Sequence, residues 1–134
     1  RGEKILEIGT GSGYQTCVLL ELGAKVFSIE RQRELHDHAV EFLPSIGYRA
    51  KLFYGDGYKG LPAYAPFDKI LVTCGAPHVP QQLLGQLKTG GVMLIPVGDG
   101  KTQLMTKVTR TGEDTFETET LKNFSFVPML EDKA

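Results

Sequence analysis

The most informative stretch of the 134-residue sequence reads Leu6-Glu7-Ile8-Gly9-Thr10-Gly11-Ser12-Gly13-Tyr14. The apolar run over residues 5–8 predicts a buried strand, and the three closely spaced glycines after it predict a tight turn. Residues 14–22 then have the composition of a helix, with Gly23 placed to cap its C-terminus. Glycines between a strand and a helix let the backbone pass close beneath a ligand. This order of elements predicts an α/β fold with a ligand site at the carboxyl end of its first strand.

Short apolar runs and helix-period segments continue to alternate along the chain. This pattern predicts βα units on a parallel sheet, because parallel strands need long crossover connections that are usually helical. The expected strands are residues 5–8, 25–30, 50–54, 68–73 and 92–97, and the expected helices are residues 14–22, 32–43 and 79–87. We expect Pro44 to stop the second helix, and Thr89-Gly90-Gly91 to end the third and lead into the fifth strand.

After Asp99-Gly100 the pattern changes to two strand-like segments, residues 103–109 and 116–126, joined by a polar turn. Such a pair predicts an antiparallel hairpin. The whole chain is therefore expected to form one α/β domain over residues 1–134, with five parallel strands plus a C-terminal antiparallel pair. Because the sequence begins at Arg1 without Met and enters a strand almost at once, we expect that an N-terminal part of the fold is missing.

Composition excludes several functional classes. Hydrophobic residues make up 41% and charged residues 23%, which indicates an ordinary globular protein and excludes wholesale disorder. Lys and Arg number 15 against 16 Asp and Glu, so bulk charge does not favour a nucleic-acid partner. Cys17 and Cys74 have no metal-site spacing and form no disulfide framework. With no apolar run of membrane-spanning length and no signal peptide, we expect a cytoplasmic protein without a membrane partner or a bound metal.

The glycine spacing discriminates between two kinds of nucleotide ligand. A dinucleotide-binding turn reads G-x-G-x-x-G and leads into a helix N-terminus that receives the diphosphate. Here the spacing is G-x-G-x-G, and Tyr14 follows. S-adenosylmethionine carries no phosphate, so a glycine turn of this kind can accommodate it, and Glu7 could hold its ammonium group. The spacing favours this cofactor over NAD; a turn needed only for packing is the alternative.

Two further acids follow the second and third expected strands at the same edge of the sheet. Glu30 stands 21 residues after Gly9, where an ionised carboxylate can accept hydrogen bonds from both ribose hydroxyls. Asp56, between two glycines, can accept a hydrogen bond from an adenine amino group. The alternatives are an exposed strand-end acid for Glu30 and a plain Asp-Gly turn for Asp56.

With these residues in place the sequence resembles class I S-adenosylmethionine-dependent methyltransferases, and more narrowly the protein-L-isoaspartate O-methyltransferase family. The glycine turn is common to most methyltransferases. Three other blocks are more specific: Gly55-Asp56-Gly57-Tyr58, Ala65-Pro66-Phe67-Asp68 and Phe126-Val127-Pro128. The resemblance covers essentially the whole chain. It implies a Rossmann-like sheet with helices on both faces, and last two strands that are placed differently from the general methyltransferase order.

The resemblance implies methyl transfer from S-adenosylmethionine to the free carboxylate of an isoaspartyl residue, with S-adenosyl-L-homocysteine as product. The ester then closes to a succinimide, whose hydrolysis restores some normal aspartyl linkage. That carboxylate is already ionised at neutral pH, so no general base is required.

The resemblance also implies the residues of the site. The implied cofactor-binding residues are Glu7, Gly9, Thr10, Gly11, Gly13, Glu30, Arg31, Asp56, Gly57 and Thr73, and the implied substrate-binding residues are Ala76, Pro77, Phe126, Val127 and Pro128. The family's Ser or Thr motif is expected upstream of Arg1, in a further N-terminal region that nothing in this sequence matches. No catalytic residue is therefore assigned.

The histidines and cysteines are expected to be incidental. His36 and His38 lie two positions apart on a predicted helix and so point in different directions, unlike a pair of metal ligands. We expect both to be solvated, and Cys17 to belong to the core. Cys74 and His78 lack a third group that would orient a thiol nucleophile.

Two other functions stay open at this point. The first is another class I methyltransferase, acting on a small molecule or on RNA, although the chain has neither a basic, aromatic-rich stripe nor an Asn/Asp-Pro-Pro-aromatic run. The second is a cofactor-binding module without turnover. The family resemblance implies a monomer, whereas a missing N-terminal region would uncover part of one sheet face and allow dimerisation or domain swapping.

Overall fold

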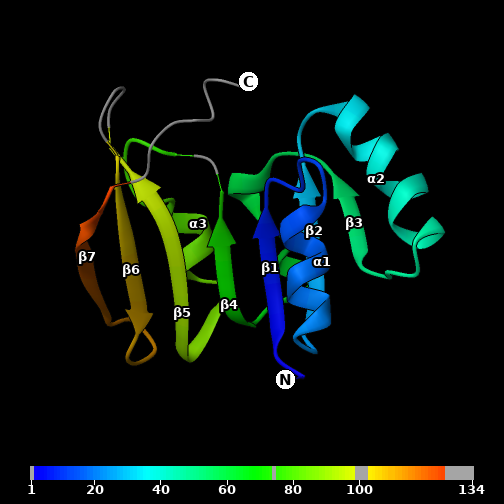
Figure 1. Cartoon of the computed structure of the whole chain (residues 1–134). Coiled ribbons are helices and arrows are strands. Elements are labelled where there is room, and N and C mark those ends of the chain that lie inside the picture. Colours follow the sequence, from blue (N-terminus) through cyan, green and yellow to red (C-terminus); the bar gives the residue numbers. More distant parts are fainter. Residues whose placement is uncertain (1, 74, 99–102, 126–134) are drawn as a thin grey trace.

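The computed structural model describes residues 2–73, 75–98 and 103–125, which form one seven-stranded sheet with helices on both faces (Figure 1). None of the helices in these ranges combines the length and the apolar character that crossing a membrane requires. The strands are β1 (Lys4–Ile8), β2 (Lys25–Glu30), β3 (Lys51–Tyr54), β4 (Phe67–Val72), β5 (Leu87–Val97), β6 (Leu104–Arg110) and β7 (Phe116–Ser125). The helices are α1 (Tyr14–Glu21), α2 (Arg33–Ser45) and α3 (Gln81–Leu84), with 3₁₀ turns η1 (Gly57–Lys59) and η2 (Pro62–Tyr64).

The strand order is β3-β2-β1-β4-β5-β6-β7. Strands β1 to β5 pair in parallel, whereas β6 runs antiparallel to β5, and β7 antiparallel to β6. The five parallel strands and the C-terminal hairpin predicted from the sequence are therefore confirmed. The chain moves outward from β1 to β3, returns to place β4 beside β1, and then continues to the opposite edge. Open α/β sheets hold ligands at such a reversal, outside the carboxyl ends of the strands.

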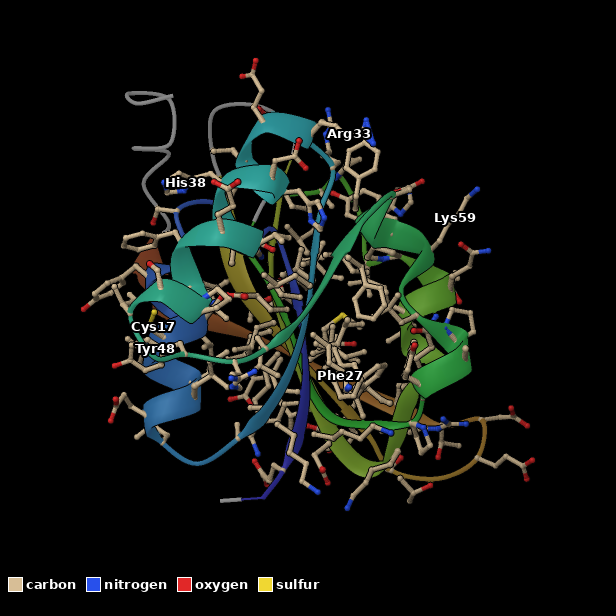
Figure 2. The ribbon with its side chains drawn as sticks, turned by 90° about the vertical axis from the view of Figure 1, so that its right-hand side faces the viewer. Cys17, Phe27, Arg33, His38, Tyr48 and Lys59 are labelled. Carbon is tan, nitrogen blue, oxygen red and sulfur yellow. The ribbon has the colours of Figure 1, made fainter. Side chains whose placement is uncertain are left out.

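The two faces of the sheet carry different helices. Figure 2 shows α1 and α2 on one side of the sheet and the η1–η2 segment with α3 on the other. Side chains alternate between the faces along each strand. Ile5 and Val26 form a small cluster with Leu19 of α1, while Leu6 and Phe27 belong to the larger core that also includes Leu83 of α3.

Part of the α1 face is less well covered. On β4, β5 and β6 the side chains of Leu71, Leu94 and Met105 are half-buried, although Met93 on the opposite face is fully buried. The described residues place no helix over this part of the sheet (Figure 1). An incompletely covered sheet face was predicted from the sequence; the dimerisation that it would allow stays a prediction.

Two predicted boundaries are wrong. Helix α2 continues to Ser45 and includes Pro44, because a proline in the last turn removes only one hydrogen bond near an end that frays anyway. Residues 89–91 lie inside β5 rather than before it, and helix α3 is correspondingly short. Phe67 pairs with Leu87 but Lys69 pairs with residue 92, so β5 accommodates the glycines as extra residues in a bulge.

Asp68 connects the amino ends of β1, β4 and β5, and we expect this connection to stabilise the fold. Its carboxylate accepts a hydrogen bond from the Lys4 backbone N–H (2.8 Å) and forms an ion pair with the Lys88 ammonium group (2.6 Å). The Lys4 N–H, and then Lys88, hold the pKa of Asp68 below its ordinary value. The folded-state pKa is the lower one, so the stabilisation is present above the unfolded-state pKa and disappears as the pH falls through the folded-state pKa.

We expect Asp68→Asn to lower the free energy of unfolding by about 1 kcal/mol at neutral pH. In urea unfolding the difference from the wild type should shrink as the pH falls below about 4. Glu3→Gln is the matched control, because the Lys69–Glu3 pair is about twofold more exposed at its carboxylate and should contribute little. A difference that persists unchanged in acid would contradict this role for Asp68.

Candidate functional site

A pocket of about 340 Å³ lies at the carboxyl ends of β1 and β2, where the strand order reverses. This volume is within the range of small-molecule sites. The residues around the pocket come from the ends of β1 and β2, the η1 segment and the loop after β4: Ile8, Gly9, Ile29, Glu30, Arg31, Gln32, Asp56, Gly57, Tyr58 and Gly75. Residues 12–15, at the N-terminus of α1, do not line it. The lining therefore does not include the amides at the start of α1, where a diphosphate is usually bound.

The glycine turn between β1 and α1 is held in a conformation that L side chains rarely adopt. Gly9, Gly11 and Gly13 have φ angles of 102°, 57° and 91°. Such left-handed values explain why all three positions of the motif are glycine. The Gly9 N–H donates to the Ile29 carbonyl (2.7 Å), which ties the start of the turn to β2.

Glu30 connects the glycine turn to the pocket. The residue is 5% exposed, and one carboxylate oxygen accepts from the Gly11 N–H (2.8 Å) while the other accepts from the Gln32 N–H (3.0 Å). A carboxylate oxygen has room for a second hydrogen bond. The side chain also lines the pocket, so the Glu30 carboxylate is available as a hydrogen-bond acceptor to a ligand there. Two adjacent hydroxyl groups, as in a ribose, match this arrangement.

Asp56 and Gly57 form the opposite wall. The Asp56 carboxylate accepts from the Tyr58 N–H (3.0 Å) and thereby caps η1, so Asp56 both makes the turn and lines the pocket. Gly57 is buried against Ile8, and an added Cβ would lie 2.2 Å from the Ile8 Cγ2 atom. The pocket therefore depends on the absence of a side chain at this position.

The family model for protein-L-isoaspartate(D-aspartate) O-methyltransferase matches residues 1–134. The chain belongs to this family. A protein-L-isoaspartate O-methyltransferase of Christiangramia forsetii is 59% identical over 134 residues, which are 99% of this chain and 62% of that protein. That of Flavobacterium psychrophilum is 57% identical with the same shares of both chains. The chain thus spans about 62% of the length of these relatives.

Solved structures agree with the family fold. One structure named protein-L-isoaspartate O-methyltransferase superposes with a TM-score of 0.78 at 29% identity, covering 90% of this chain and 40% of the other. A Plasmodium falciparum structure described as a protein-L-isoaspartate O-methyltransferase in complex with S-adenosyl-L-homocysteine gives a TM-score of 0.71 at 22% identity. It covers 94% of this chain and 65% of the other and shows the shared fold alone. The predicted Rossmann-like class I methyltransferase fold is therefore confirmed.

In this member of the family Glu7 is not among the residues that line the pocket, and its predicted contact with an ammonium group stays a prediction. The side chain is fully buried beneath α1 and accepts hydrogen bonds from Thr16, Ser28 and Gln15. Burial raises the pKa of the Glu7 carboxyl, and these three hydrogen bonds oppose that rise. Glu7 lies one residue before the end of β1, so helix α1 covers it while Ile8 reaches the pocket.

Four other residues predicted to bind the cofactor are not among the residues that line the pocket. Thr10 is 5% exposed, with its hydroxyl 2.6 Å from that of Ser28. Thr73 donates its hydroxyl to the Ile8 carbonyl (2.9 Å) and so holds β1 from the side of β4. Gly11 and Gly13 shape the turn without lining the pocket. These residues support the wall, whereas Gly9, Glu30, Arg31, Asp56 and Gly57 form it.

The residues predicted to bind the substrate differ in their environments. The Ala76 side chain is 2% exposed and part of the core, and its backbone bridges to β5, so a direct substrate contact of that side chain is not supported. Pro77 is exposed beside it. Phe126, Val127 and Pro128 lie outside the described residues.

The expected Ser or Thr motif of the family has no counterpart in the part of the chain that the structure describes. The resemblance places this motif upstream of Arg1, and Arg1 itself lies outside the described residues, which begin at Gly2. The position of the motif therefore stays a prediction, and no catalytic residue is assigned among the described residues.

Sequence reasoning missed several lining residues, notably Gln32, Tyr58 and Gly75. The Tyr58 hydroxyl donates to the Gly75 carbonyl (3.2 Å), so two of these lining residues are joined directly. All three follow strand ends or lie in the Gly-Asp-Gly-Tyr block. Their positions at the carboxyl edge of the sheet were the only sequence feature that could have identified them as lining residues.

The histidines have ordinary environments. His38 is exposed and stacks on Phe42, as expected for a solvated residue, whereas His36 is half-buried against Tyr54. Cys17, expected in the core, is only half-buried, and Cys74 lies outside the described residues.

Proposed function

We propose that the protein transfers a methyl group from S-adenosylmethionine to the free carboxylate of L-isoaspartyl residues in damaged proteins and peptides. The observation that carries this proposal is the pocket lined by the buried Glu30 side chain, whose carboxylate is held by the N–H groups of Gly11 and Gln32 beside the glycine turn. Family membership supports the choice of reaction. The chain spans about 62% of its relatives' length, and we extend their activity to it as a proposal.

The residues of the pocket fit an adenosyl group. Glu30 would accept hydrogen bonds from the two ribose hydroxyls, and Asp56 would accept one from the adenine amino group. Ile8 and Ile29 supply apolar surface for the flat base. The absence of α1 amides from the lining favours a ligand without a diphosphate. When bound, S-adenosylmethionine supplies a sulfonium-activated methyl group.

The proposed reaction requires the protein to orient the isoaspartyl carboxylate and does not require it to transfer a proton. An isoaspartyl carboxylate has a pKa of about 4 and is ionised at neutral pH. The protein then needs to exclude water from this nucleophile and hold it in line with the bond that breaks. We infer that Gly75 and the Tyr58 hydroxyl, which line the pocket and are joined by a hydrogen bond, help to define the approach of the acceptor.

Methyl transfer to a matched pair of peptides tests the proposal. One peptide carries a single isoaspartyl residue, and its twin carries a normal aspartyl residue at the same position. We expect radiolabelled methyl groups to appear almost entirely on the isoaspartyl peptide. Equal rates on both peptides would contradict the repair function. Binding of S-adenosylhomocysteine without transfer to either peptide would instead indicate a cofactor-binding module without turnover.

A further inference from the structure

A buried chain of polar side chains lies directly beneath the glycine turn. The Thr10 hydroxyl is 2.6 Å from the Ser28 hydroxyl, which donates to a Glu7 carboxylate oxygen at 2.7 Å. Thr16 donates to the same oxygen, and the Gln15 amide donates to the other at 3.0 Å. Glu7, Thr16 and Ser28 are fully buried. None of the five side chains lines the pocket, so the proposed chemistry does not use them directly.

Each hydroxyl group has one proton to donate, and this determines the direction of the Thr10–Ser28 hydrogen bond. The Ser28 and Thr16 hydroxyls and the Gln15 amide each donate a hydrogen bond to a Glu7 carboxylate oxygen. The single hydroxyl proton of Ser28 is then committed to Glu7. Ser28 can therefore only accept from Thr10, and Thr10 must be the donor. The orientation of a residue inside the glycine turn is thus determined by a carboxylate on β1.

We propose that Thr10, Ser28 and Glu7 form a relay that holds the glycine turn in its ligand-binding conformation, with Thr10 and Ser28 as positioning residues. This inference rests on the proposed function, because it concerns affinity for the adenosyl cofactor. Thr10 lies between Gly9 and Gly11, and the Gly11 N–H is bound by Glu30. Ser28 and Glu30 stand two residues apart on one face of β2. One strand therefore anchors two successive residues of the turn and also presents the ribose acceptor.

A turn that is already anchored does not have to be ordered when the cofactor binds. Without the Thr10–Ser28 hydrogen bond, part of the population would hold Gly11 away from Glu30, and binding would have to restore the contact. Removing one buried hydrogen bond of this kind should weaken S-adenosylhomocysteine binding by roughly fivefold to tenfold. The effect should appear although neither hydroxyl reaches the pocket.

Isothermal titration of S-adenosylhomocysteine into three variants tests the relay. Thr10→Val removes the hydroxyl at nearly constant shape and should weaken binding by roughly fivefold to tenfold. Thr10→Ser keeps the hydroxyl and should bind within about twofold of the wild type. Thr106→Val is the matched control, because this threonine is also buried (6% exposed) but bonds to the Leu104 carbonyl on β6. It should leave the affinity unchanged, even where urea unfolding shows a loss of stability.

A double-mutant cycle provides the second readout. Ser28→Ala alone should weaken binding at least as much as Thr10→Val, and adding Thr10→Val to it should cost little more. Additive effects, or a Thr10→Val affinity equal to that of Thr106→Val, would overturn the relay while leaving the proposed function intact. A wild-type protein that does not bind S-adenosylhomocysteine would overturn both. Unfolding curves of each variant establish that the titrated protein is folded.

Discussion

Glu30→Ala is expected to weaken S-adenosylhomocysteine binding by roughly hundredfold. The carboxylate is buried, lines the pocket and is pre-aligned by the N–H groups of Gly11 and Gln32. Its replacement removes two charge-assisted acceptors for the ribose and leaves both N–H groups without their partner. Two such hydrogen bonds together account for about 2–3 kcal/mol, which corresponds to the expected loss. Isothermal titration calorimetry measures the change directly.

Two further variants distinguish the loss of the Glu30 hydrogen bonds from the loss of one negative charge. Glu34→Ala removes an equal charge four residues away, on the exposed first turn of α2, and should leave binding within about twofold. Glu30→Gln keeps the shape but halves the number of acceptors, so it should fall between the wild type and Glu30→Ala. A Glu30→Ala protein that binds within about threefold of the wild type would exclude Glu30 as the ribose acceptor.

Gly57→Ala should narrow the pocket at the wall formed by the η1 segment and so weaken cofactor binding. The new Cβ would meet the Ile8 Cγ2 atom at 2.2 Å, and both residues line the ligand space. Ile8 is 5% exposed within the core and has little freedom to move, so the η1 segment has to shift. We expect a loss of about 1–3 kcal/mol in the free energy of unfolding and at least tenfold weaker binding of S-adenosylhomocysteine.

Gly55→Ala supplies the matched control within the same turn. No atom lies within 4 Å of a Cβ added there, and its φ is not positive. The variant should therefore be as stable as the wild type, or slightly more stable because the unfolded chain loses freedom. If urea unfolding and calorimetry gave the same values for both alanine variants, packing against Ile8 would not be what requires glycine at position 57.

Most of the architecture was predictable because its signals are local. The buried run before Gly9, the alternation of strands with helical segments and the polar turn before β7 each appear within a short window of residues. The Glu30 and Asp56 assignments rest on similar reasoning, since both acids directly follow or end a strand at the carboxyl edge. Parallel strands bring such positions together whatever the intervening helices look like.

Sequence patterns were least informative where packing between distant segments decides the position of a residue. Glu7 looked like a ligand contact because it precedes the glycine turn, but the packing of α1 places Thr16 and Gln15 over it. Ala76 looked like a loop residue, yet it forms a bridge to β5 and enters the core. The length of β5 depends on a bulge against β4, which no local pattern reveals.

Titration of the wild-type protein with S-adenosylhomocysteine and, separately, with NAD tests the central claim most directly. The pocket is lined by described residues from the carboxyl ends of β1 and β2, the η1 segment and the loop after β4. We expect saturable one-to-one binding of S-adenosylhomocysteine and no measurable heat with NAD. Binding of NAD, or failure to bind S-adenosylhomocysteine, would contradict the assignment of this pocket to an adenosyl sulfonium cofactor.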